Sequence, residues 1–108
     1  MFARILAFEI NAEDREQLVK AVKDQMLPIL KQQVGFLEML PLFERKERQE
    51  KILTISLWTT RHDAERYEKN LFPQVLEILK PFATTKVEVS HANLETSLCD
   101  RFVDALSV

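Results

Sequence analysis

Two histidines are the residues of this chain best suited to proton transfer. His62 and His91 are its only histidines, and imidazole is the side chain whose ordinary pKa lies nearest to neutrality. His62 falls between two charged residues in the first turn of a predicted helix, a position typical of a solvated surface residue. His91 ends a predicted strand and continues the side of Val87 and Val89, where a structural histidine and a catalytic one are both compatible with the pattern. Both are candidate bases.

Two aromatic residues could hold a flat ligand. Trp58 ends a predicted strand, where its indole could form a pocket wall and donate one hydrogen bond, or could pack a helix onto the sheet. Tyr67 lies on the apolar stripe of the following helix, and it could orient a substrate oxygen or stabilise an oxyanion, or serve packing alone. Pocket and core are therefore alternatives for both residues. A space between Trp58 and the second helix that is filled by side chains would exclude chemistry there.

Arg4 is a charge on an otherwise apolar face of the first predicted strand. Its neighbours on that face are Phe2, Leu6 and Phe8, and a buried charge needs a partner. The partner could be a carboxylate across a dimer or at the sheet end, which would make Arg4 structural. It could instead be the anionic group of a ligand, which would make Arg4 a binding residue.

Composition excludes several classes of chemistry. The single cysteine, Cys99, rules out an internal disulfide, and no Cys/His spacing resembles a metal site. The one glycine, Gly35, is too few for a dinucleotide fingerprint or a P-loop, so we expect no cofactor of those classes. A net charge of -2 with interspersed signs gives no field for nucleic acid. We also expect no membrane segment, because no apolar run approaches about 20 residues, and no signal peptide, and hence a cytoplasmic protein.

Four predicted strands give the chain its framework. Residues 51–58 form the central one, and neither of its alternating faces is polar enough to face water. Residues 2–10 and 84–92 are two further strands. Residues 36–45 form the remaining strand, which Pro41 restricts to a sheet edge or a bulge, and residues 46–50 form the turn into the central strand.

The predicted helices carry apolar residues at steps of three and four. The first begins at an Asn11 cap and runs to residue 34, with a break near Pro28 and a left-handed stop at Gly35. The second starts at a capping pair, Thr60 and Asp63, and is divided into residues 63–71 and 72–79 by Pro73. Residues 96–106 read as a short C-terminal helix.

The resulting order, β-α-β-β-α-β, predicts a single α+β domain over residues 1–108. The expected arrangement is ferredoxin-like, a four-stranded antiparallel sheet in the order 4-1-3-2. Two helices cover one face of such a sheet, while the second face of strands one and three is also apolar. We therefore expect a homodimer that joins two sheet faces around a barrel-like core.

Residues 2–92 resemble the antibiotic-biosynthesis monooxygenase-like family of the dimeric α/β-barrel superfamily. The resemblance is carried by Val34-Gly35-Phe36 and by residues 55–67, ISLWTTRHDAERY, with a tryptophan at the strand end and a helix entered through an acidic residue and alanine. The family includes cofactor-free oxygenases of polycyclic phenols, quinol oxidases and haem-degrading enzymes. The haem-degrading branch has an Asn in the first strand, a strand-end Trp and a His on the second helix. Trp58 matches the Trp, but Ala7, Phe8 and Glu9 occupy the outer half of the first strand and Leu76 and Glu77 stand where that His would fall, so the resemblance does not extend to haem.

The resemblance implies a cofactor-independent monooxygenase of small aromatic, quinol or polyketide-like phenolic substrates. Trp58 would then stack on the substrate, Tyr67 would hydrogen-bond it, Arg4 would anchor an anionic group, and His91 or His62 would be the base. No metal is expected. The alternative is a non-catalytic dimeric barrel that binds a small apolar ligand or has a structural or stress role.

Overall fold

A computed structural model describes residues 1–99 of the chain. Its strands are β1 (Phe2–Asn11), β2 (Phe36–Lys46), β3 (Gln49–Trp58) and β4 (Glu88–Asn93). They form one antiparallel sheet in the order β2-β3-β1-β4, which is the predicted order read from the other edge. The predicted ferredoxin-like α+β fold is confirmed. Pro41 lies on the edge strand β2, as its missing N–H requires.

The first helical stretch is continuous but not uniform. It consists of a 3-10 turn η1 (Ala12–Asp14), α1 (Arg15–Ala21), a π-helical segment η2 (Val22–Met26) and α2 (Leu27–Lys31). The predicted break near Pro28 is thus a widened turn just before the proline. Asn11 occupies the predicted N-cap position, but its side chain makes no capping hydrogen bond. Its amide oxygen instead accepts from Gln49 Nε2 at 2.6 Å, which ties β1 to β3.

The second helix is divided as predicted into α3 (Arg61–Asn70) and α4 (Phe72–Leu79). Thr60 caps α3, since its hydroxyl accepts from the Asp63 N–H at 3.1 Å, and the helix begins two residues earlier than expected. The first helical stretch ends at Lys31, with Gln32 as its C-cap, rather than at residue 34 with a stop at Gly35. Gly35 follows in the connection to β2 with φ 84°, and a Cβ there would overlap the Asp63 carboxylate, so only glycine lets this connection lie against the start of α3.

Three predicted boundaries are corrected. The β2–β3 turn contains only Glu47 and Arg48, with Glu47 at φ 55°, so both strands are longer than expected. Strand β4 begins at Glu88 rather than residue 84, because the preceding threonines bind the end of β1 through side chains: Thr85 Oγ1 accepts from the Glu9 N–H at 3.0 Å. At the C-terminus a 3-10 turn, η3 (Thr96–Leu98), is present, and the rest of the predicted 96–106 helix lies outside the described residues.

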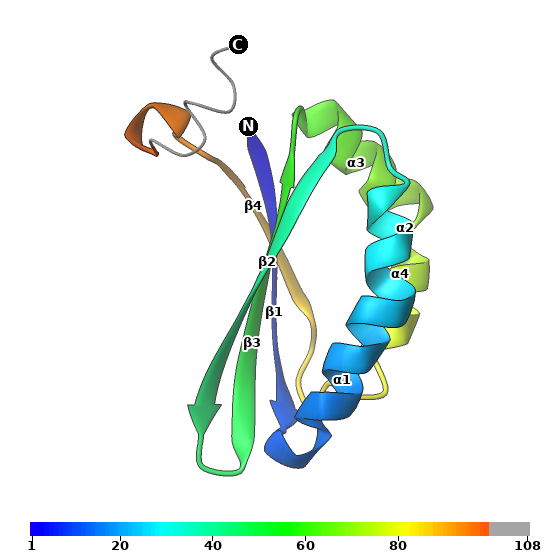
Figure 1. The fold of residues 1–108 in the computed structure, drawn as a ribbon, viewed down its shortest axis with the longest axis vertical. Coiled ribbons are helices and arrows are strands. Elements are labelled where there is room, and N and C mark those ends of the chain that lie inside the picture. The colour runs from blue at the N-terminus through cyan, green and yellow to red at the C-terminus, as the bar shows by residue number, and fades with distance from the viewer. Residues whose placement is uncertain (100–108) are drawn as a thin grey trace.

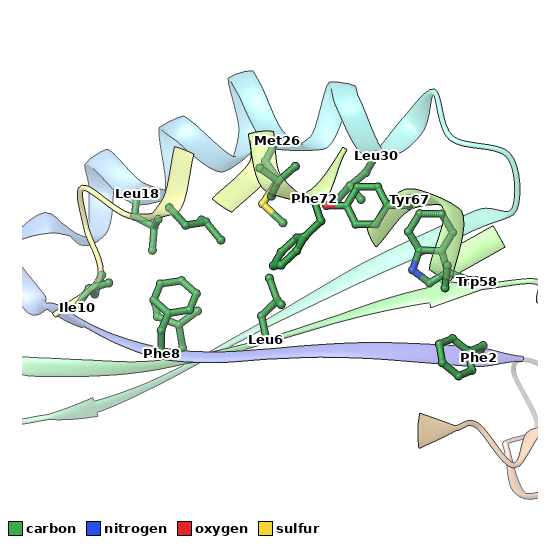
Figure 2. Packing of buried hydrophobic residues seen from close by; sticks show 14 residues of the cluster. Phe2, Leu6, Phe8, Ile10, Leu18, Met26, Leu30, Trp58, Tyr67 and Phe72 are labelled. Carbon is green, nitrogen blue, oxygen red and sulfur yellow. The ribbon is translucent and has the colours of Figure 1, made fainter. Parts of the chain in front are cut away.

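The helices cover one face of the sheet (Figure 1), and the core lies between the helices and that face. Figure 2 shows Leu18, Met26 and Leu30 of the first helical stretch opposite Leu6 and Phe8 of β1. Register pairs place the helix-facing residues of β1 and β3 in layers: Ile10 with Glu50, Phe8 with Ile52, Leu6 with Thr54, Arg4 with Ser56, and Phe2 with Trp58. Two charged residues, Arg4 and Glu50, thus lie on the face that forms the core.

The opposite sheet face is apolar at its centre, and none of the helices α1 to α4 covers it (Figure 1). Its exposed members on β2 are Leu40 at 37% and Leu42 at 51%. We call this surface the open face; it comprises Ile5, Ala7, Leu40, Leu42, Leu53 and Ile55. The apolar side chains that alternate along the first and third strands in the sequence therefore share one face of the sheet.

Among residues 1–99, no helix has both the length and the apolar character needed to cross a bilayer.

Candidate functional site

An apolar groove opens between the first helical stretch and strands β2 and β3. Its volume is about 310 Å³. Thr54 lines its floor, its surface is apolar, Lys23 lies at its exposed rim, and Val19, 44% exposed, lies beside the opening. The groove is lined by Phe8, Leu18, Val19, Val22, Lys23, Met26, Leu27, Met39, Pro41, Phe43, Ile52, Thr54 and Leu79. Such a lining suits a compact apolar or aromatic ligand.

The π-helical segment forms much of the wall of this groove. Val22, Lys23 and Met26 all line the groove, and all belong to η2. A π turn holds an additional residue per turn and occurs often at functional sites. The edge strand supplies the facing wall through Met39, Pro41 and Phe43 at alternate positions. The groove therefore depends on backbone features at both walls.

Arg4 forms the centre of a second cluster. It is 2% exposed, its Nη2 lies 3.5 Å from Glu68 Oε1, and its guanidinium lies over the rings of Tyr67 at 5.2 Å and Phe72 at 4.4 Å. Its Nε and Nη2 have no hydrogen-bond partner within the described structure. Burial lowers the pKa of Arg4, and the Glu68 carboxylate opposes that shift. The ion-pair partner therefore comes from α3 of the same chain.

Trp58 and Tyr67 pack against each other beside Arg4. Trp58 is fully buried and donates its Nε1–H to Ser56 Oγ at 3.0 Å, and its ring lies 5.1 Å from that of Tyr67. Burial raises the pKa of Tyr67 to about 12, although Arg4 acts in the opposite direction. The phenol is therefore neutral at physiological pH. Both residues are buried and their rings are in contact, as Figure 2 shows for the labelled pair, so no open space remains for a substrate between Trp58 and the second helix.

The cluster extends to the surface through Glu68 and His91. Glu68 Oε2 lies 3.1 Å from His91 Nε2, and the His91 ring stacks on Phe2 at 5.7 Å. His91 pairs with Arg4 across β4 and β1 and has a side chain that is 42% exposed. The carboxylate thus joins a buried guanidinium to an accessible imidazole.

The structure brings together Arg4, Trp58, Tyr67 and His91 but not His62. His62 lies on the exposed first turn of α3, as its neighbours in the sequence indicated. None of these five residues lines the groove. Their proposed roles stay predictions, and the cavity itself lies one sheet layer away from Arg4, on the β2 side.

Sequence reasoning missed two carboxylates. Glu68 was signalled by Arg4, because a charge on an apolar strand requires an opposite charge on the helix packed over it. Glu50 was signalled by alternation, because residues 50, 52, 54, 56 and 58 share one side of β3. Residue 50 fell in the predicted turn, which hid this relation.

These features define the class: a ferredoxin-like α+β fold with an apolar groove under its first helical stretch. The fold is that of antibiotic biosynthesis monooxygenase structures, as the resemblance implied. One such structure aligns with a TM-score of 0.67 at 13% identity, over 87% of this chain and 98% of that chain. No protein-family model matches the sequence, and no curated protein matches it.

Two further similar structures are those of an oxygenase and a monooxygenase. SnoaB, a cofactor-independent oxygenase from Streptomyces nogalater, aligns with a TM-score of 0.71 at 14% identity, over 92% of this chain and 98% of that chain. A monooxygenase from the ActVA-Orf6 gene of Streptomyces coelicolor, solved with nanaomycin D, aligns with a TM-score of 0.63 at 12% identity, over 87% of each chain. At these identities the likeness shows the fold.

Proposed function

We propose that the protein is a cofactor-independent monooxygenase of small aromatic, quinol or polyketide-like phenolic substrates. The observation that carries the proposal is the apolar groove of about 310 Å³ in a fold shared with SnoaB, a cofactor-independent oxygenase. The groove matches the planar, largely apolar character of such substrates. It would hold the ring system in one orientation and exclude water from it.

The reaction needs a proton acceptor and an oriented substrate rather than a bound redox group. For an anthrone, loss of a proton gives an electron-rich anion that reduces O2, and the ring CH2 becomes C=O with release of water. Atoms balance as one anthrone and one O2 giving one quinone and one H2O. The protein supplies binding, orientation and proton transfer.

The candidate residues receive the following roles. Trp58 and Tyr67 pack on each other outside the groove lining, so they would support the sheet and α3 beside the groove rather than contact the substrate there. Arg4, one layer from Thr54, supplies positive charge that favours an anionic substrate. His91, held by Glu68, and His62 are the two imidazole candidates for the base.

Oxygen uptake with an anthrone or a naphthoquinol tests the proposal. Val22→Trp places an indole inside the groove and is expected to abolish the uptake, whereas Val34→Trp, at a position that is 69% exposed and outside the groove, is its matched control. Trp58→Phe is expected to reduce the rate. A wild-type rate no faster than that in buffer, or equal rates in the two valine variants, would remove the proposal.

The two histidines are separated by single substitutions. His91→Gln removes the imidazole while keeping a hydrogen-bonding group near Glu68, and His62→Gln does the same on the exposed turn of α3. If one of these histidines is the base, its glutamine variant is expected to lose the increase of the oxygen-uptake rate with pH. Unchanged profiles in both variants would exclude both histidines as the base.

We further propose that two copies pair through their open faces. Leu42 is 51% exposed and Leu40 is 37% exposed, and burying such a continuous apolar surface is favourable by about 25 cal/mol per Å². Leu42→Glu is expected to give a monomer in sedimentation analysis, and Val34→Glu, away from this face, is expected to leave the dimer intact. A wild-type monomer at micromolar concentration would contradict the pairing.

The proposal also includes a cytoplasmic location and the absence of a tightly bound cofactor. The single cysteine is suited to a reducing compartment. The purified protein is expected to show no visible absorption band. A flavin or haem spectrum that stays with the protein through purification would contradict this part of the proposal.

A non-catalytic ligand-binding barrel is the second candidate, and one observation favours it. The groove lining contains neither a carboxylate nor an imidazole, so chemistry there depends on residues beyond the lining. Stoichiometric binding of an anthrone without oxygen uptake would support this alternative over the monooxygenase.

A further inference from the structure

Glu50 is a buried carboxylate without a hydrogen-bond donor for one of its oxygens. It is 3% exposed, and its Oε2 has no hydrogen-bond partner in the described structure. Arg15 Nε lies 3.4 Å from Oε2, close enough for an ion pair but not aligned for a hydrogen bond, and the Arg15 side chain is 54% exposed. A buried acceptor in this condition is costly unless something binds it.

Glu50 adjoins one end of the groove. It lies two residues before Ile52 on the same side of β3, and Ile52 lines the groove. Arg15 links the two features, because its guanidinium packs 5.0 Å from the centre of the Phe43 ring, another lining residue. Leu18, one helical turn after Arg15, lines the same end.

The groove offers little else to a polar ligand group. Its surface is apolar, and the cation of Lys23 lies at the exposed rim. An apolar ligand with one hydroxyl would therefore find its strongest acceptor at the Glu50 end. A ligand with a carboxylate there would meet like charge and desolvation together.

We propose that Glu50 accepts the hydroxyl of a neutral phenol bound in the groove and removes its proton. The step is balanced: the phenolic O–H bond breaks, the proton joins the Glu50 carboxylate, and the phenolate oxygen keeps the electron pair beside the Arg15 guanidinium. This inference rests on the proposed function for its catalytic part, while its binding part rests on the groove alone. It makes Glu50 a third candidate base, and the one of the three that adjoins the groove wall.

Binding of three probes of one ring size tests the inference. The affinities of 2-naphthol, naphthalene and 2-naphthoate are measured by calorimetry at neutral pH, where 2-naphthol is uncharged. In the wild type 2-naphthoate is expected to bind at least about tenfold more weakly than 2-naphthol. The ratio of 2-naphthol to naphthalene affinity is expected to fall about tenfold or more in Glu50→Leu, because a hydrogen bond to a charged acceptor is lost.

Three further variants control the measurement. Glu50→Gln keeps the side-chain shape and a weaker acceptor, so it is expected to show an intermediate ratio and serves if Glu50→Leu does not fold. Glu44→Gln removes an exposed carboxylate of β2 and is expected to leave the ratio unchanged. Val22→Trp is expected to weaken all three probes, which places them in the groove.

The outcomes separate this inference from the monooxygenase proposal. A wild-type ratio that persists in Glu50→Leu and Glu50→Gln, or an absence of 2-naphthol binding to the wild type, overturns the role of Glu50. If the ratio of 2-naphthol to naphthalene affinity falls in Glu50→Leu but the wild type consumes no O2 with any phenol, Glu50 recognises the hydroxyl and the monooxygenase proposal is excluded. Undiminished O2 uptake by Glu50→Gln overturns the proton transfer.

Discussion

Replacing Glu68 by glutamine is expected to destabilise the fold by about 2 kcal/mol. Arg4 is 2% exposed, and Glu68 supplies the carboxylate 3.5 Å from its Nη2. Coulomb's law at an effective dielectric constant of about 20 gives about 5 kcal/mol for two unit charges at that distance. Because the Glu68 side chain is 32% exposed, solvent screens part of this attraction, which leaves about 2 kcal/mol. Glutamine keeps the side-chain volume while the Arg4 charge loses its partner.

The opposite half of the pair behaves differently. Arg4→Met removes the buried charge and leaves an apolar side chain against Tyr67 and Phe72, so its stability is expected to lie within about 1 kcal/mol of the wild type or above it. The double variant Arg4→Met/Glu68→Gln is expected to be more stable than Glu68→Gln alone. This recovery is the signature of a charge that needed compensation.

The free energy of unfolding of the wild type, the two single variants and the double variant is measured by urea unfolding, followed by the fluorescence of the single tryptophan. Protein concentration is held constant, because pairing of two copies would add to the apparent stability. Glu65→Gln is the matched control on α3, since Glu65 pairs with the exposed Arg61 and contributes less than about 0.5 kcal/mol. The reasoning would be refuted if Glu68→Gln left the free energy of unfolding unchanged while Arg4→Met lowered it by more than about 3 kcal/mol.

Three other perturbations have expected outcomes. Gly35→Ala is expected to cost about 1–3 kcal/mol in thermal unfolding, because φ is 84° and the new Cβ overlaps Asp63; a melting temperature equal to that of the wild type would contradict this. Thr60→Ala is expected to cost about 1 kcal/mol through loss of the α3 cap, measured by urea unfolding against the wild type. The pKa of Tyr67 is raised to about 12 from 10.0, so the unfolded phenol ionises first and stability falls as pH rises through that interval. The ionisation of this single tyrosine is followed by its ultraviolet absorbance, and a midpoint near pH 10 in the folded protein would show the prediction to be wrong.

Much of the fold is predictable because its signals are local. Alternation over residues 51–58 and steps of three and four in the helices depend on side chains that are close in sequence. Pro41 restricted β2 to an edge for a backbone reason, and Thr60 and Asp63 form their cap within one turn. The sheet order followed from the order of these elements along the chain, β-α-β-β-α-β, which is that of the ferredoxin-like arrangement.

The features that were not predicted depend on distant partners. Asn11 is a good capping residue by type, but Gln49, 38 residues away, takes its side-chain oxygen. The position of the groove depends on how the first helical stretch lies over β2 and β3, which no local pattern records. Arg4 indicated that a carboxylate was needed, whereas the choice of Glu68 required the packing of α3 on the sheet.

The widened turn at Val22–Met26 has a consequence for how this chain tolerates change. A π turn accommodates one additional residue within the helix, so the residues on either side keep the faces that they would have in an uninterrupted α-helix. Deleting one residue from this stretch is therefore expected to restore an ordinary α-helix while Leu27 keeps its neighbours, and to move the wall that Val22, Lys23 and Met26 form. The length of these five residues thus sets the dimensions of the groove rather than the course of the helix.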